Sequence, residues 1–131
     1  MSAAAVDLNP GFAAAAAVAL AGCGAHLVLG SARVVRPLLT VEGLPRVSRW
    51  INYYTYHMAT VTLLVMAAGF AWAAARPDAA DAAVLLMTMA AIFAPLCAWV
   101  ALRAGLPAWR LPPFWLFLII LAAGTGGFLL R

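Results

Sequence analysis

The residues best able to carry chemistry are the two histidines, His26 and His57, the only ones among 131 residues. An imidazole can bind haem iron or another metal, and it can exchange a proton near neutral pH. If the two helices that carry them end near residues 35 and 49, both histidines lie about 12–14 Å from those ends, at about 1.5 Å per residue. We therefore expect the two imidazoles to occupy nearly one layer of neighbouring helices.

The neighbours of each histidine at helical spacing suggest that both faces point into the protein. Gly22 and Gly30 flank His26 at i−4 and i+4, a pattern of small residues that lets helices approach closely. Tyr53 and Tyr54 precede His57 at i−4 and i−3, so they are the residues best placed to touch its ring. The sequence also predicts a close-packing patch of small residues at positions 124–127, near the end of the last helix.

Two hypotheses use the histidine pair as it stands. In the first, each imidazole forms a hydrogen bond with a tyrosine, a hydroxyl group or the other histidine, and so holds helices together. In the second, His26 and His57 are the axial ligands of a b-type haem between the helices. The glycines would leave room for the macrocycle, and Arg33 and Arg36, with two further loop arginines, would pair with its propionates.

A third hypothesis adds the cysteines to the histidines. His26, His57, Cys23 and Cys97 could form a small metal site or a quinone-type pocket, although their spacing matches no recognised metal-binding signature. Both cysteines fall inside apolar segments at different depths. We therefore expect them to pack as small apolar residues, without a disulfide.

An enzymatic alternative depends on the tyrosines beside His57. Tyr53 and His57 could serve a lipid- or isoprenoid-modifying enzyme whose arginines hold an anionic headgroup. No Asp, Glu, Lys or Arg falls inside an apolar segment. This absence argues against proton-coupled exporters and against catalysis by paired carboxylates.

The elements that must position these residues follow from composition. Hydrophobic residues make up 67% of the chain and charged residues 9%, which is far from a soluble domain and indicates a polytopic membrane protein. Charged residues bound four windows of 25, 26, 21 and 20 uncharged residues, each long enough to cross a bilayer as a helix. We predict one all-α domain, an antiparallel four-helix transmembrane bundle. Its helices span residues 11–34, 49–75, 81–103 and 112–130.

The arginines predict the orientation of these helices. Six lie in the connections after the first and third helices, whereas only Arg76 and Arg131 lie on the opposite side. The positive-inside rule then places both of those connections in the cytoplasm and both termini outside. The exclusive use of arginine and the abundance of alanine suggest a bacterial protein of the inner membrane.

The preferred functional interpretation is an accessory or structural membrane subunit rather than an enzyme. Small bundles seldom cover all their polar faces alone, so we expect a homo-oligomer or a place among other membrane subunits, in contact with membrane lipids. The basic pI of about 9.8 reflects topology and anionic lipid, and no nucleic-acid partner is expected. The haem-binding electron-transfer subunit and the lipid-modifying enzyme remain the alternatives.

Overall fold

The computed structural model describes residues 8–131, and these residues form helices without strands. Four helices are long and apolar enough to cross a membrane, which indicates a multi-pass membrane protein. The first is continuous but changes its winding, from α-helix to a π segment and back. The elements are α1 (Pro10–Ala25), the π segment (His26–Val35), α2 (Arg36–Thr40), α3 (Arg46–Ala75), α4 (Ala80–Arg103) and α5 (Pro112–Leu129), with short 3₁₀ turns at Pro77–Ala79 and Ala108–Arg110.

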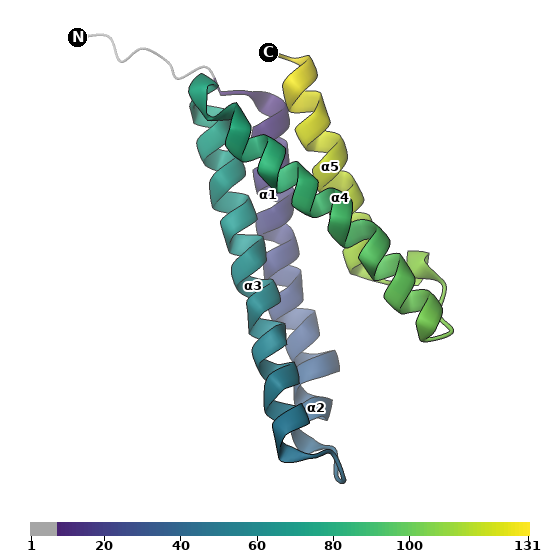
Figure 1. Ribbon diagram of the computed structural model, residues 1–131. Coiled ribbons are helices and arrows are strands. Elements are labelled where there is room, and N and C mark those ends of the chain that lie inside the picture. The colour runs from purple at the N-terminus through teal and green to yellow at the C-terminus, as the bar shows by residue number, and fades with distance from the viewer. Residues whose placement is uncertain (1–7) are drawn as a thin grey trace, which may run out of the picture.

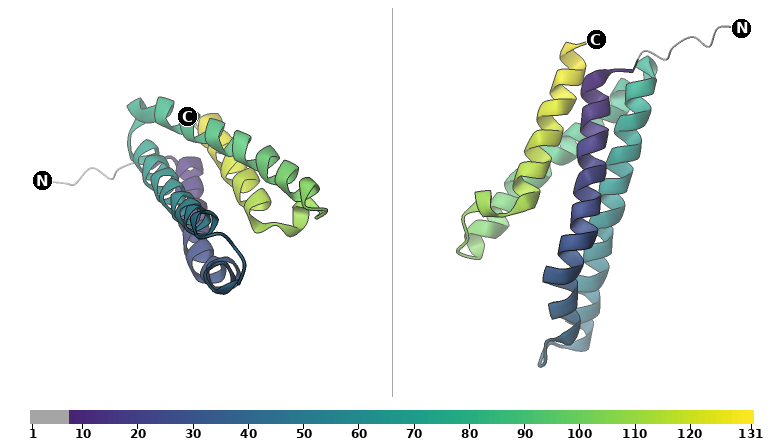
Figure 2. Two further views of the ribbon diagram at one scale, coloured as in Figure 1. Left: turned by 60° about the horizontal axis from the view of Figure 1, so that its bottom comes forward. Right: turned by 180° about the vertical axis from the view of Figure 1, so that it is seen from behind.

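The helices form two hairpins that meet at one end (Figure 1). α1 and α3 run side by side in opposite directions, and α5 packs against both α1 and α4. The α4–α5 hairpin diverges from α1 and α3 away from the C-terminal end of α5, as Figure 2 also shows. As a result, the π segment, α2 and the first turns of α3 extend beyond the reach of α4 and α5.

The shared core lies at the end where the hairpins meet. Four large side chains are fully buried there: Phe12 from α1, Met66 and Phe70 from α3, and Ile120 from α5. Buried alanines surround them, and alanine lets helix backbones approach closely. The ring of Phe12 packs 6.5 Å from that of Phe70, between centroids, and so ties α1 to α3.

The first helix continues six residues past its predicted end at residue 34, to Thr40. Pro37 lies inside this helix, although a proline ring clashes with the carbonyl group of residue i−4 in a regular α-helix. In the structure the π segment comes directly before it, and the amide of Arg36 bonds to Ser31 O, five residues back. This wider winding relieves the crowding before the proline, so the helix can go on.

Asn9 fixes the start of α1, and its replacement by alanine should lower the free energy of unfolding by about 1–2 kcal/mol. Its side-chain oxygen accepts a hydrogen bond from Phe12 N at 3.1 Å, and its side-chain nitrogen donates to Gly127 O on α5 at 2.8 Å. Alanine loses both bonds, whereas Asn9→Asp keeps the cap and loses only the bond to Gly127. Unfolding in mixed micelles should therefore rank Asn9→Asp between the native protein and Asn9→Ala; equal stability of all three would contradict this role.

Candidate functional site

The π segment begins at His26, opposite Tyr56 of α3. A Cβ atom on Gly30 would lie 2.8 Å from the Tyr56 ring and its hydroxyl oxygen, so only glycine leaves room for this side chain. π-Helical turns are rare and are found frequently at functional sites. The change of winding, the glycine and the tyrosine together mark this layer as the candidate site.

His26 and Tyr56 form a reciprocal pair. His26 Nε2 lies 3.1 Å from Tyr56 O, and the Tyr56 hydroxyl donates to His26 O at 2.6 Å. Because a carbonyl oxygen can only accept, the hydrogen on Nε2 is assigned from this partner. The two rings also stack, with centroids 4.2 Å apart and planes 21° apart. Each residue thus bonds to the backbone of the other, and we call this arrangement the His26–Tyr56 lock.

Residues one turn from the lock extend the contact between α1 and α3. Thr60 Oγ1 donates to Tyr56 O at 3.4 Å, and Cys23 Sγ lies 3.9 Å from Thr60 O. Tyr56 is 8% exposed and Thr60 is 9% exposed, so these polar groups are sheltered by one another. The layer is therefore a helix–helix contact whose buried hydrogen-bonding groups are paired.

His57 lies outside the lock, on the exposed side of α3. Its ring packs edge-on against Tyr53, 4.5 Å between centroids, and against Tyr56 at 5.4 Å. Tyr54, the other predicted neighbour, is 63% exposed, and no aromatic contact joins it to His57. The structure thus brings Tyr53 to His57 and leaves Tyr54 apart.

The haem hypothesis needs open space between the two imidazoles. In the structure the Tyr56 ring contacts both, and Nε2 of His26 is engaged with a backbone carbonyl group. Arg33 and Arg36, the predicted propionate partners, are exposed on the segment beyond. This geometry offers no support for a haem between His26 and His57.

The metal hypothesis also lacks support. Across residues 8–131, no three residues of the types His, Cys, Asp and Glu gather into a group that could hold a metal ion. Cys23 is buried between α1 and α3, whereas Cys97 is half-buried on α4, in the other hairpin. Of the two cysteines predicted as ligands, only Cys23 therefore lies in the same hairpin as the two histidines.

Tyr56 is the residue that sequence reasoning missed. Tyr53 and Tyr54 were predicted instead, because they precede His57 at helical spacing. The sequence contains another helical spacing, because Tyr56, Thr60 and Leu63 follow one another at i, i+4 and i+7. In the structure all three are buried. This spacing could have identified Tyr56 as the residue that faces the first helix.

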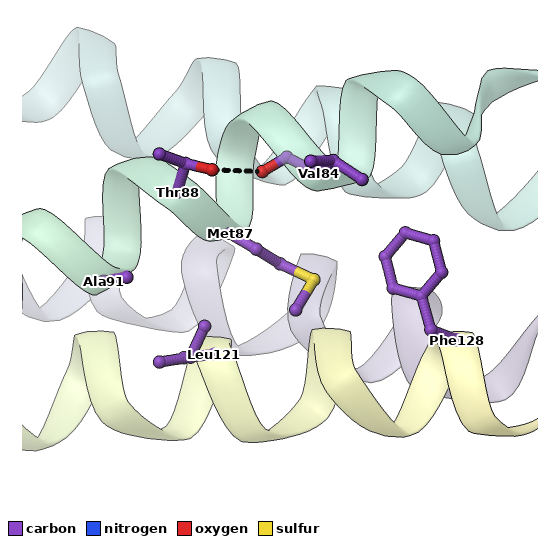
Figure 3. A pocket seen from close by; sticks show the side chains of 6 residues that line it. All are labelled: Val84, Met87, Thr88, Ala91, Leu121 and Phe128. Atoms are coloured by element: carbon purple, nitrogen blue, oxygen red, sulfur yellow. Dashed lines mark hydrogen bonds between the residues drawn. The ribbon is translucent and has the colours of Figure 1, made fainter.

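Cavities elsewhere carry little chemistry. One, of about 410 Å³, opens between α4 and α5, where the Met87 side chain reaches toward α5 (Figure 3). Its one hydroxyl group, on Thr88, donates to Val84 O of its own helix at 2.9 Å. A second, of about 460 Å³, lies where α1 begins and α5 ends, away from the lock, beside Asn9 and Arg131. Neither cavity is lined by a histidine or a tyrosine.

Comparison with known proteins identifies no family for this chain. No protein-family model, no curated protein and no solved structure matches the chain.

Proposed function

We propose that the protein is a structural subunit of a membrane complex, in which the histidine layer holds helices together rather than performing catalysis. The observation that carries this proposal is the His26–Tyr56 lock. Its imidazole and phenol are directed at the backbone of the facing helix, so neither is free to act on a substrate. A helix contact of this kind serves assembly and shape.

The placement in the membrane follows from helix length. A hydrocarbon core about 30 Å thick accommodates about 20 helical residues. Counted from Pro10 and Ala75, where α1 begins and α3 ends, that length reaches about residue 30 on the first helix and residue 55 on α3. The start of α5 gives the edge of the hydrocarbon core at a similar level, within about one turn. Leu116 contacts Gly22 of α1, and α5 begins one turn before Leu116 in the chain. We therefore place the lock within about two turns of the edge of the hydrocarbon core, with residues 31–54 beyond that edge.

Residues 31–54 form what we call the arm, and its surface supports a partner. The first helix has 31 residues, against 18 residues, about 27 Å, for α5. Three valines of the arm, Val34, Val41 and Val47, are 52%, 46% and 70% exposed. Apolar side chains beyond the hydrocarbon core gain stability when another protein surface covers them. We propose that a second copy or another subunit does so.

The remaining features of the proposal concern topology. We propose an antiparallel four-helix arrangement in a bacterial inner membrane, with the arm and the connection between α4 and α5 in the cytoplasm. The support is the arginine distribution, six on that side and two on the other.

Site-specific photocrosslinking in cells tests the subunit proposal. A photoreactive residue at Val47 should give an adduct of defined mass, either of two copies or of this chain with a second protein. The same residue at Leu106, which is 45% exposed in the other cytoplasmic connection, serves as the matched control and should give none. Absence of an adduct at all three arm valines, or equal adducts at Val47 and Leu106, would overturn the proposal.

An absorption spectrum of the purified protein distinguishes this proposal from the electron-transfer alternative. The structural subunit is expected to be colourless after haem-replete expression. A Soret band that shifts on reduction and disappears in His57→Ala would replace the proposal with the haem hypothesis.

A further inference from the structure

We propose that the exposed face of α3 between Arg46 and Leu64 binds the phosphate headgroup of an anionic phospholipid. The site is distinct from the lock, which lies on the buried side of the same helix. It rests on the membrane placement proposed above, which puts His57 within about one turn of the hydrocarbon boundary.

The residues of this face form one continuous stripe. They follow one another at intervals of three or four, which places them on one side of a helix. Trp50 packs edge-on against Tyr53 at 5.7 Å and 89°, and Tyr53 packs against His57 at 4.5 Å and 82°. These contacts pack the imidazole edge-on against the ring of Tyr53, on the same side of the helix as Trp50. The stripe consists of Arg46, Trp50, Tyr53, His57, Val61 and Leu64.

The imidazole of His57 has no hydrogen-bond partner among the residues that the structure describes. No hydrogen bond joins its ring nitrogens to another of the residues described, in contrast to His26, which bonds to Tyr56 O. A polar group at the hydrocarbon edge is unfavourable without a hydrogen-bond partner. A phosphate oxygen at the level of the lipid headgroups supplies such a partner.

The charge of the arm selects an anionic headgroup over a zwitterionic one. Its four arginines, Arg33, Arg36, Arg46 and Arg49, are accompanied by a single acid, Glu42, and no ion pair neutralises them within the described part of the chain. One amino group of Arg49 donates to Val41 O at 2.7 Å, whereas its Nε atom is buried without a partner. The arm therefore presents unneutralised positive charge on the side of His57 that lies away from the hydrocarbon core.

The apolar end of the stripe favours a lipid over a free phosphate ion. Val61 and Leu64 are 55% and 47% exposed and continue the face of His57 toward the middle of the bilayer. They give an acyl chain a surface to lie on while its phosphate group remains at His57 and Arg46. A free phosphate ion would use the polar end alone.

Native mass spectrometry of the full chain tests this assignment by titration with phosphatidylglycerol and, separately, with phosphatidylcholine. We expect phosphatidylglycerol to bind about fivefold more tightly, the effect of about one surface arginine. Arg46→Gln should remove most of that preference, and His57→Phe should weaken binding of phosphatidylglycerol by a similar factor. Arg76→Gln, an exposed arginine at the other end of α3, is the matched control and should leave binding unchanged.

Three results would overturn the proposal. Equal binding of the two lipids would exclude headgroup selection. A loss in Arg76→Gln as large as that in Arg46→Gln would show that net charge, not this face, attracts the lipid. Competition by millimolar inorganic phosphate, with no effect of Val61→Ser or Leu64→Ser on lipid binding, would assign the polar end to a free phosphate ion.

Discussion

Gly11→Ala should destabilise the protein by about 3 kcal/mol, the upper part of the range for inserting a methyl group into a packed contact. A Cβ atom on Gly11 would overlap the backbone nitrogen and Cα atoms of Gly127 on α5. A side chain in its way could rotate, but helix backbone cannot move without separating α1 from α5. The substitution should therefore loosen the end of the molecule where the shared core lies.

Gly24→Ala is the control for this experiment. Gly24 lies on the same helix, and a Cβ atom there would meet nothing within 4 Å. Alanine favours helix over glycine by about 0.5–1 kcal/mol, so Gly24→Ala should leave stability unchanged or raise it slightly. Reversible unfolding of both variants in mixed micelles gives the comparison, and equal free energies of unfolding would contradict the backbone contact between α1 and α5.

The helical character of the chain could be predicted because it depends on composition and on the spacing of charges. Uncharged windows of 20 or more residues leave a chain in lipid few alternatives to a helix. The small residues at 124–127 were predicted to pack closely, and Gly124 and Gly127 do so, against Met87 and Phe12, whereas a Cβ atom added on Gly126 would meet nothing within 4 Å. Helix type and small-residue contacts are local properties, which is why the sequence reveals them.

The winding of the first helix could not be predicted in this way. Nothing in the residues 26–35 alone requires π-helical turns, and a proline at position 37 by itself favours an earlier end of the helix. The π segment, which accommodates Pro37, is also in contact with a distant residue, since Tyr56 occupies the space over Gly30 and bonds to His26 O. A tertiary contact of this kind affects the local backbone conformation, but it leaves no pattern in the neighbouring sequence.

The candidate site was predicted in part for the same reason. The depth argument predicted one layer for both histidines, but two histidines at equal depth do not have to face each other. Rotation about the axis of α3 places Tyr56 toward α1 and His57 toward the outside. A difference of one residue, about 100° of rotation, separates a helix contact from a free imidazole.

Tyr56→Ala should have an effect comparable to that of Gly11→Ala, a loss of about 3 kcal/mol in the free energy of unfolding, the lower end for truncating a buried aromatic residue. The substitution removes the ring that stacks on His26 and the hydroxyl that bonds to His26 O. It also opens a cavity over Gly30, where the ring had filled the space between the π segment and α3.

Tyr56→Phe separates the two contributions, because it keeps the ring and removes the hydroxyl. Hydrogen bonds between membrane helices contribute about 0.6 kcal/mol on average and about 1.7 at most, so this variant should lose about 1 kcal/mol. Tyr54→Phe is the matched control, since Tyr54 is 63% exposed and should tolerate the same change. If Tyr56→Phe is as stable as Tyr54→Phe, the hydroxyl does not lock the helices, and the proposed role of the layer loses its main support. If Tyr56→Phe instead loses as much as Tyr56→Ala, the hydrogen bond to His26 O, rather than ring packing, holds the π segment against α3.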